Sequence, residues 1–394
     1  MPPKPAAARQ AASRKTAKPK LAAKPAVVPA LPPSLPGQVV LVLQGGGALG
    51  AYQGGVYQAL HEAGIEPDWV IGTSIGAINA ALIAGNPPAQ RLAHLQAFWR
   101  GVEQGNPFVP ALPDPLGLAQ SWANLTTVLR GIPGFFTPRA TTLQGSQSRV
   151  GVEAASYYST QPLHQTLTQL VDFDYLATSK TRLTVGAVHV QGGQMRYFDS
   201  RDERLEVAHV VASGALPPVF AAVRIHGEPY WDGGIYSNTP IEAVMDDKPR
   251  RDALIFAVDV WQPNGPEPQS INEVLARQKD IQYASRADSH IERQQQIHRL
   301  RHIIRELHRQ MPAAQQTDTA IKALAAWGCK STMQVVRLQV PRIEGEDQTK
   351  DIDFSSAGIH QRWQAGYQHT QAVLARAPWQ EAADPMEGVV VHSA

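Results

Sequence analysis

A serine between two glycines is the first group in this chain that could do chemistry. The motif Gly72-Thr-Ser-Ile-Gly76 lies where the apolar run 69–71 meets an alanine-rich stretch typical of a helix. Glycines on both sides allow a sharp strand-to-helix turn and leave the serine hydroxyl exposed at its apex. Ser74 is therefore a candidate nucleophile for acyl transfer. For this motif alone, an ordinary turn with glycines for close packing is the alternative.

A glycine loop precedes the serine motif and follows the apolar run 39–43. It contains four glycines, Gly45, Gly46, Gly47 and Gly50. The first three can present unobstructed N–H groups near a helix start, where the helix dipole favours negative charge, and the last lets the backbone pack closely. The loop could thus receive the oxyanion of an acyl transfer.

The same glycine spacing is also the pattern of a dinucleotide-binding loop between a strand and a helix. That function needs an acidic residue about 20 residues further on, at the end of the second strand. Here the second strand ends in the serine motif instead. The sequence therefore favours an oxyanion site over a dinucleotide site.

The serine needs a base within hydrogen-bond reach, and a histidine is the usual expectation. His189, His209 and His226 lie within the core region, but none follows a turn signal that would bring it to the serine. The turn Asp232-Gly233-Gly234 follows a predicted hairpin, and its glycines allow another loop to approach closely. A partly desolvated aspartate can take the serine proton without a histidine. Asp-Gly-Gly is also common as a plain turn.

A parallel α/β sheet can bring these motifs together. The first strand, the glycine loop, a helix and the second strand form a β-α-β unit. Its right-handed crossover places the glycine loop and the Ser74 turn at the same carboxyl edge of the sheet. Other strands are predicted at 182–190, 195–199, 223–225, 228–232, 254–260 and 335–340. Further helices are predicted at 88–102, 163–171, 206–213, 271–311 and 356–374.

Composition divides the chain into three parts. Residues 1–36 are rich in Ala, Pro and Lys, hold seven basic residues and no acidic one, and are predicted to be disordered. Residues 37–262 carry the motifs. Residues 263–394 are expected to form a helical region with a strand, packed on the core. Between 86 and 160 the pattern is irregular, and its aromatic residues fit either core packing or a lid that contacts lipid.

The basic arm, residues 1–36, has several possible uses. It could bind an anionic partner, such as nucleic acid, a membrane or a granule surface. It could equally be a solubilising extension, and an organelle transit peptide is a third possibility after these two. Without the arm the chain carries 29 basic and 34 acidic residues, so the basic excess belongs to the arm alone.

With 43% hydrophobic and 18% charged residues, the chain has the composition of a soluble globular protein. Its single cysteine rules out an internal disulfide. No apolar run is long enough to cross a membrane and no secretory leader is evident. A cytoplasmic protein that could bind a lipid surface peripherally is therefore expected. The four histidines of the helix at 271–311 lack further ligands at a suitable spacing, so no metal site is predicted.

The glycine loop, the serine turn and Asp-Gly-Gly, in this order, resemble the patatin-like phospholipases. The segment Ala212-Ser-Gly-Ala-Leu-Pro-Pro-Val-Phe220 is similar to the one that this family carries upstream of its aspartate, and Asn238-Thr-Pro240 follows as it does there. The resemblance covers about residues 38–262. It implies a three-layer α/β/α hydrolase core with a mostly parallel central sheet.

The resemblance also implies roles for individual residues. Ser74 would be the nucleophile and Asp232 its general base in a Ser-Asp dyad, with an oxyanion hole at the first three loop glycines. The other motif glycines are Gly50, Gly72, Gly76, Gly233 and Gly234. The implied activity is hydrolysis of acyl esters of phospholipids or neutral lipids in lipid degradation, without a metal or other cofactor. Leu49 stands where the family often has Arg or Lys, which favours a less polar ester.

Two questions stay open from the sequence. The region after residue 262 is similar to the extra C-terminal region of a bacterial subgroup, whose role the resemblance does not give. A different class of function is also conceivable, in which the basic arm does the main work for a surface- or nucleic-acid-associated protein with a weak or vestigial hydrolase core. The two functions could combine if the arm brings an esterase to an anionic lipid or polyester surface.

Overall fold

The computed structural model describes residues 35–104, 131–139, 148–343, 346–382, 384 and 386–393. These residues belong to one compact unit. The predicted disorder of the basic arm falls almost entirely outside the described residues, as does much of the irregular stretch between 86 and 160.

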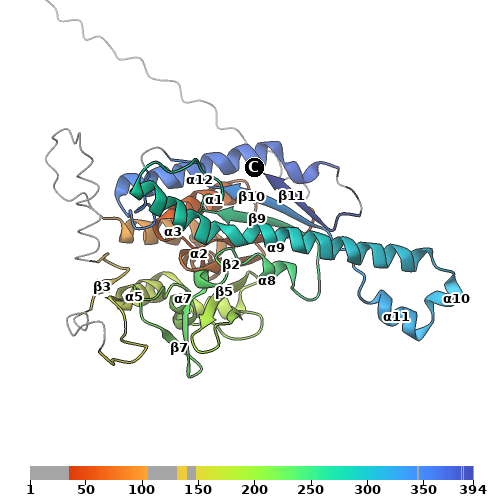
Figure 1. Ribbon diagram of the computed structural model, residues 1–394, viewed down its shortest axis with the longest axis horizontal. Helices are drawn as coiled ribbons and strands as arrows, with labels where there is room; N and C mark the ends of the chain where they lie inside the picture. The colour runs from red at the N-terminus through yellow and green to blue at the C-terminus, as the bar shows by residue number, and fades with distance from the viewer. Residues whose placement is uncertain are drawn as a thin grey trace, which may run out of the picture. The chain divides into compact units, whose positions relative to one another are not determined.

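A nine-stranded sheet forms the centre of this unit (Figure 1). Its order is β11-β10-β9-β1-β2-β5-β8-β7, and β6 pairs with β5 beside this path. The strands are β1 Gln38–Leu43, β2 Trp69–Thr73, β5 Arg182–His189, β6 Met195–Asp199, β7 Val223–Ile225, β8 Glu228–Asp232, β9 Ala253–Asp259, β10 Met333–Gln339 and β11 Val389–Ser393. All pairs from β11 to β5 are parallel, whereas the pairs that involve β6, β7 and β8 are antiparallel. The prediction of a mostly parallel α/β sheet is confirmed.

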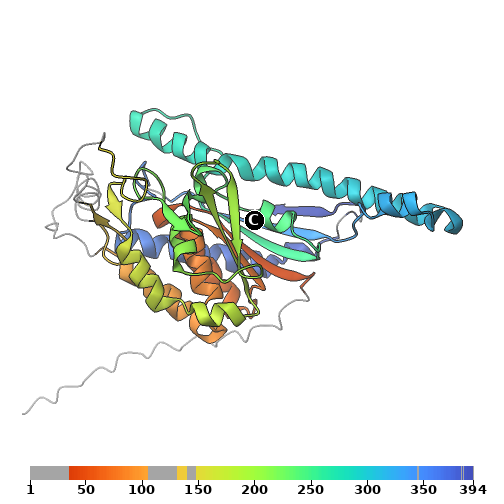
Figure 2. The same cartoon turned by 90° about the horizontal axis from the view of Figure 1, so that it is seen from below.

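Helices cover both faces of the sheet, which gives the three layers (Figure 2). The odd-numbered residues of β1 pack in a cluster with α1, α2 and α12, and its even-numbered valines pack with α8 and α9. Strands buried on both faces explain the continuous apolar runs in the sequence. The helices of seven or more residues are α1 Ala51–Glu62, α2 Ile75–Ala84, α3 Pro88–Val102, α5 Gln161–Leu170, α7 Val207–Ser213, α9 Ile271–Gln310, α11 Thr319–Ala325 and α12 Ser356–Arg376 among the described residues. The shorter ones are α6 Phe173–Thr178, α8 Glu242–Met245 and α10 Ala313–Gln316.

The region after residue 262 continues the central sheet. β10 pairs with β9 along its whole length, and β11 pairs with β10. On one face α12 packs tightly on α1, because a Cβ on Gly366 would lie only 2.1 Å from the Tyr52 carbonyl oxygen. The sequence predicts one strand in this region, whereas the structure has two. The second, β11, is a short valine run that follows the last predicted helix.

None of the helices in the described part of the chain has an apolar stretch sufficient to span a lipid bilayer.

Candidate active site

Ser74 occupies the sharp turn between β2 and α2. Its backbone has φ 56° and ψ −125°, a conformation that costs a residue other than glycine about 1–3 kcal/mol. Gly72 and Gly76 are required because a Cβ on the first would lie 2.3 Å from the Gly76 carbonyl, and one on the second 2.2 Å from the Leu43 carbonyl oxygen. The Ser74 N–H donates to both the carbonyl and the hydroxyl oxygen of Ser213, each 3.1 Å away. The end of α7 therefore supports the strained turn.

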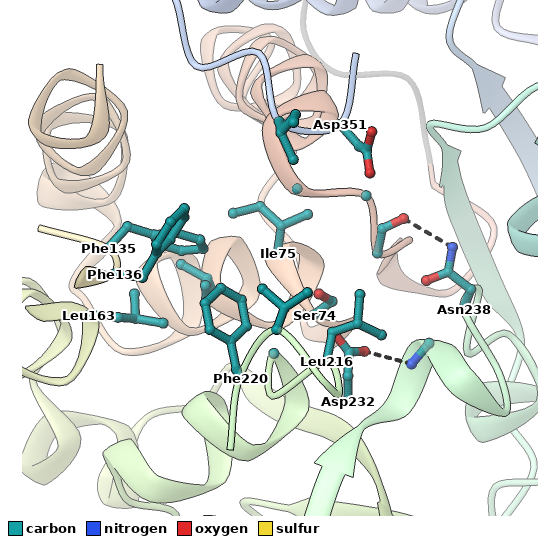
Figure 3. Close-up of a pocket in the computed structure, with 18 of the residues that line it drawn as sticks. Ser74, Ile75, Phe135, Phe136, Leu163, Leu216, Phe220, Asp232, Asn238 and Asp351 are labelled. Carbon is teal, nitrogen blue, oxygen red and sulfur yellow. Dashed lines mark hydrogen bonds between the residues drawn. The ribbon is translucent and has the colours of Figure 1, made fainter. Parts of the chain in front are cut away.

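Asp232 lies at the end of β8 and is only 3% exposed. Its carboxylate Oδ1 accepts the Gly234 N–H at 2.7 Å, and its own N–H donates to the Ala215 carbonyl at 3.0 Å. The Ser74 side chain lies near enough to this carboxylate to lower the pKa of its carboxyl. Figure 3 shows the Ser74 and Asp232 side chains beside each other at the cavity. The structure thus brings the two predicted residues together.

The environment of Asp232 changes its acidity. Burial raises the pKa of its carboxyl from 3.8 to about 7, although the hydrogen bonds from Gly234 and Ser74 lower it. A carboxylate is a better proton acceptor when its pKa is raised, and a pKa near the working pH suits a general base. Such a perturbed group in a cavity is typical of functional sites.

Gly45 lies directly against Ser74. A Cβ there would be 3.0 Å from the Ser74 Cβ and 2.3 Å from Oδ1 of Asn238. The Gly45 N–H donates to the Asn238 carbonyl at 3.1 Å. Its carbonyl accepts hydrogen bonds from Asn238 Nδ2 at 3.0 Å and from Trp261 Nε1 at 2.7 Å. Because its N–H is already engaged, Gly45 anchors the loop and has no amide left for an oxyanion.

Gly46 and Gly47 keep their amides available. Within the described residues, neither N–H donates a hydrogen bond, and both glycines line the cavity with Ser74. Gly47 has φ +55°, and a Cβ on it would lie 2.2 Å from the Asp351 carbonyl oxygen. The same oxygen accepts the Ala48 N–H at 2.8 Å. The Asp351 carbonyl, from the C-terminal region, therefore helps to fix the conformation of the glycine loop. The sequence did not predict this contact.

The cavity has a volume of about 180 Å³ and mainly apolar walls. Ten apolar side chains line it, namely Ile75, Ile78, Phe135, Phe136, Leu163, Leu216, Val219, Phe220, Ile352 and Phe354. Three of their rings pack against one another, with the Phe220 ring centre 6.3 Å from that of Phe135 and 5.4 Å from that of Phe136. In Figure 3 these rings lie on one side of Ser74, and Asn238 and Asp351 lie on the other. An apolar wall with a few polar groups at one side fits a ligand with an aliphatic chain.

The remaining candidate groups lie away from this cavity. His189, His209 and His226 are not among its lining residues. Leu49 is buried and does not line it either. Among the described lining residues, the only charged side chains are those of two aspartates, Asp232 and Asp351.

Comparison with known proteins places the chain in a family. The sequence model for patatin-like phospholipases matches residues 41–245, just over half of the chain. The chain belongs to the patatin-like phospholipase family. A second model, described as patatin phospholipase, matches residues 281–386 of this patatin-like protein. Both matches confirm the resemblance seen in the motifs, including the extra C-terminal region.

Individual relatives are more distant or match only short segments. The lysophospholipase nte1 of Aspergillus terreus is 63% identical over 46 residues, which is 12% of this chain and 3% of that protein. The patatin-like chain thus spans a small part of this relative. VipD from Legionella pneumophila shares 14% identity at a TM-score of 0.36, over 86% of this chain and 67% of its own. A chain in the complex of full-length SpcU with full-length ExoU from Pseudomonas aeruginosa shares 15% identity at a TM-score of 0.31. The match covers 86% of this chain and 53% of that chain.

Proposed function

We propose that this patatin-like protein hydrolyses carboxylic esters of lipids through an acyl-enzyme formed on Ser74, with Asp232 as the base. One observation carries the proposal: the Ser74 side chain lies beside a buried carboxylate whose pKa is raised toward neutrality, at the wall of an apolar cavity. No histidine lies among the described lining residues to share this role.

The proposed reaction has two halves. Asp232 takes the hydroxyl proton as Ser74 Oγ attacks the ester carbonyl, and the proton then passes to the departing alcohol. Water next loses a proton to Asp232 and attacks the acyl-serine. The fatty acid leaves, and Asp232 returns that proton to Ser74 Oγ, which restores both residues. Negative charge develops on the carbonyl oxygen in both halves. We assign its stabilisation to the free N–H groups of Gly46 and Gly47, while Gly45 holds the loop in place.

The walls of the cavity suggest the class of ester. Their apolar side chains would hold an acyl chain, which is hydrophobic along its length. No described lining residue is basic, so nothing there would pair with a phosphate. The side chain of Leu49 in the glycine loop is uncharged and buried, which agrees with this. We therefore propose an ester with an uncharged head group as the preferred substrate.

A fluorophosphonate probe tests the proposal, because it reacts with an activated serine hydroxyl. We expect covalent labelling at Ser74, identified by peptide mass spectrometry. A panel of p-nitrophenyl esters, monoacylglycerols and phospholipids then reports the substrate class. A protein that is neither labelled nor able to turn over any of these esters would contradict the proposed function.

The pH profile of kcat/KM should rise as pH increases through about 7, where the Asp232 carboxyl loses its proton. Below that pH the carboxylic acid form predominates and cannot accept the Ser74 proton. The profile is measured with an ester whose leaving group does not titrate in the range studied. A rate that stays flat between about pH 5 and pH 8 would count against Asp232 as the base.

Replacing Phe220 by alanine should shift the preference toward longer or bulkier acyl chains. Loss of the ring enlarges the cavity beside Phe135 and Phe136. We expect the ratio of kcat/KM for long over short p-nitrophenyl esters to change by roughly tenfold. Phe98→Ala is the matched control, since this buried ring packs on Phe135 at 6.4 Å but does not line the cavity. An equal shift in both variants would show that general loosening is responsible.

A further inference from the structure

Three side chains that the proposed reaction does not use meet beside the hairpin that carries Asp232. Glu203 follows β6, His209 lies in the first turn of α7, and His226 lies at the tip of the turn between β7 and β8. Oε2 of Glu203 is 2.8 Å from Nε2 of His226 and 3.7 Å from Nε2 of His209. One possible ligand atom from each residue lies within 4.8 Å of the other two.

The His209 ring has a polar atom without a partner. The residue is only 4% exposed, and its buried Nε2 makes no hydrogen bond. Buried polar atoms are nearly always satisfied, so such an atom needs an explanation. The nearest charged group that faces it is the Glu203 carboxylate, at a distance too long for a hydrogen bond. An ion in the space between Glu203, His209 and His226 would give Nε2 of His209 a partner.

We propose that Glu203, His209 and His226 bind a divalent transition metal ion, zinc above all, with a water molecule as the fourth ligand. Two imidazoles and one carboxylate are a ligand set that zinc uses in proteins. Bonds of about 2.0–2.2 Å in a tetrahedral site place neighbouring ligand atoms roughly 3.4 Å apart. The separations of 2.8 and 3.7 Å from Glu203 lie on either side of this value, and the ligand atoms of the two histidines lie within 4.8 Å of each other.

The surrounding contacts orient the ligands. Arg196 contacts the other oxygen of Glu203, Oε1, at 3.5 Å and leaves Oε2 toward the histidines. The Glu206 N–H donates to Nδ1 of His209 at 2.9 Å, which closes a capping box, and the Glu206 carbonyl oxygen lies 3.3 Å from the same nitrogen. Metal binding at Nε2 requires the ring proton to move to Nδ1, where the Glu206 carbonyl can accept it in place of the capping bond.

The turn that contains His226 allows a substitution that removes the proposed ligand and keeps the turn. His226 and Gly227 both have positive φ, 51° and 85°. A two-residue hairpin turn of this kind favours Asn-Gly. His226→Asn therefore removes the proposed ligand and keeps a residue that suits the turn. Glu203→Gln removes the charge and keeps the shape of the second ligand.

The three ligands come from three separate segments of the chain. A bound ion would fasten the β7–β8 hairpin, which ends at Asp232, to α7, which ends at Ser213. The site lies outside the cavity lining, so we assign the ion a structural role and no part in ester cleavage.

Zinc binding to the full-length protein tests the site. The protein is stripped with a chelator and titrated with zinc by calorimetry, and its thermal unfolding is followed with and without the ion. We expect one tight site in the wild type and an unfolding midpoint that rises by several degrees with zinc, because the ion binds the folded state. His226→Asn and Glu203→Gln should bind zinc at least about tenfold more weakly and lose most of that rise.

His189→Asn is the matched control. Its ring contacts Glu228 at 3.1 Å on the same antiparallel part of the sheet but belongs to no such cluster. It should bind zinc like the wild type. Cobalt gives a second readout, since a tetrahedral cobalt site absorbs visible light and the His226→Asn variant should not show that absorption. The proposal is overturned if the wild type binds no stoichiometric zinc, or if His226→Asn and Glu203→Gln bind it with wild-type affinity.

Discussion

The Ser74→Ala variant is expected to lose ester hydrolysis by roughly 10⁴-fold or more, measured as kcat on a p-nitrophenyl ester. Without the hydroxyl no acyl-enzyme can form, and only binding and oxyanion stabilisation remain. The fold should be unaffected, because alanine keeps the N–H that donates to Ser213. Thermal unfolding of the variant should therefore match that of the wild type.

Ser237→Ala is a suitable control for this variant. Ser237 is also buried, at 1% exposed, but it is not among the residues that line the cavity. It should keep its activity and its labelling by a fluorophosphonate. Turnover that remains in Ser74→Ala would show that Ser74 is not the nucleophile.

The Asp232→Asn variant should lose activity by about 10²–10⁴-fold, the range expected when a general base is removed. Asparagine has nearly the same shape, and its side-chain oxygen can still accept the Gly234 N–H. The two residues act as one unit in the proposed reaction. The double variant with Ser74→Ala should therefore be little worse than Ser74→Ala alone. Losses that multiply in the double variant would contradict a dyad.

The free energy of unfolding of Asp232→Asn should rise while its activity falls. This distinguishes loss of the base from loss of the fold. In the unfolded chain the Asp232 carboxyl loses its proton near its ordinary pKa of 3.8, but in the folded protein only near 7. The folded state binds more protons between these values, so wild-type stability falls as pH rises across this window. Asparagine does not titrate. Asp232→Asn should therefore be more stable than the wild type at about pH 8, by on the order of 4 kcal/mol, and should lose this advantage toward pH 4.

Much of the fold could be predicted because its signals are local. The helix predicted at 88–102 is α3, and the first strand and the serine turn fall where apolar runs and glycines place them. A buried parallel strand needs a continuous apolar run, and a turn with positive φ or a close approach needs glycine. Such requirements appear in the sequence within a few residues of the element they determine.

The rest of the site depends on contacts between distant segments, which leave no comparable signal. Nothing in the sequence indicates that the Ser74 N–H donates to the Ser213 oxygens, or that the Gly45 N–H donates to the Asn238 carbonyl. Backbone carbonyls and amides take part in these contacts, and every residue has them. The sequence also does not indicate that His226 contacts Glu203, because this contact depends on how a hairpin folds back over a turn.

The contact between Asp351 and the glycine loop has a consequence for how the enzyme is made. The carbonyl that fits against Gly47 and accepts the Ala48 N–H belongs to a residue translated long after the three motifs. A nascent chain that has emerged only as far as Asp232 already carries its serine and its aspartate, yet the loop opposite them lacks its support. The glycine loop can therefore reach this supported conformation only after Asp351 has been synthesised, well after the three motifs.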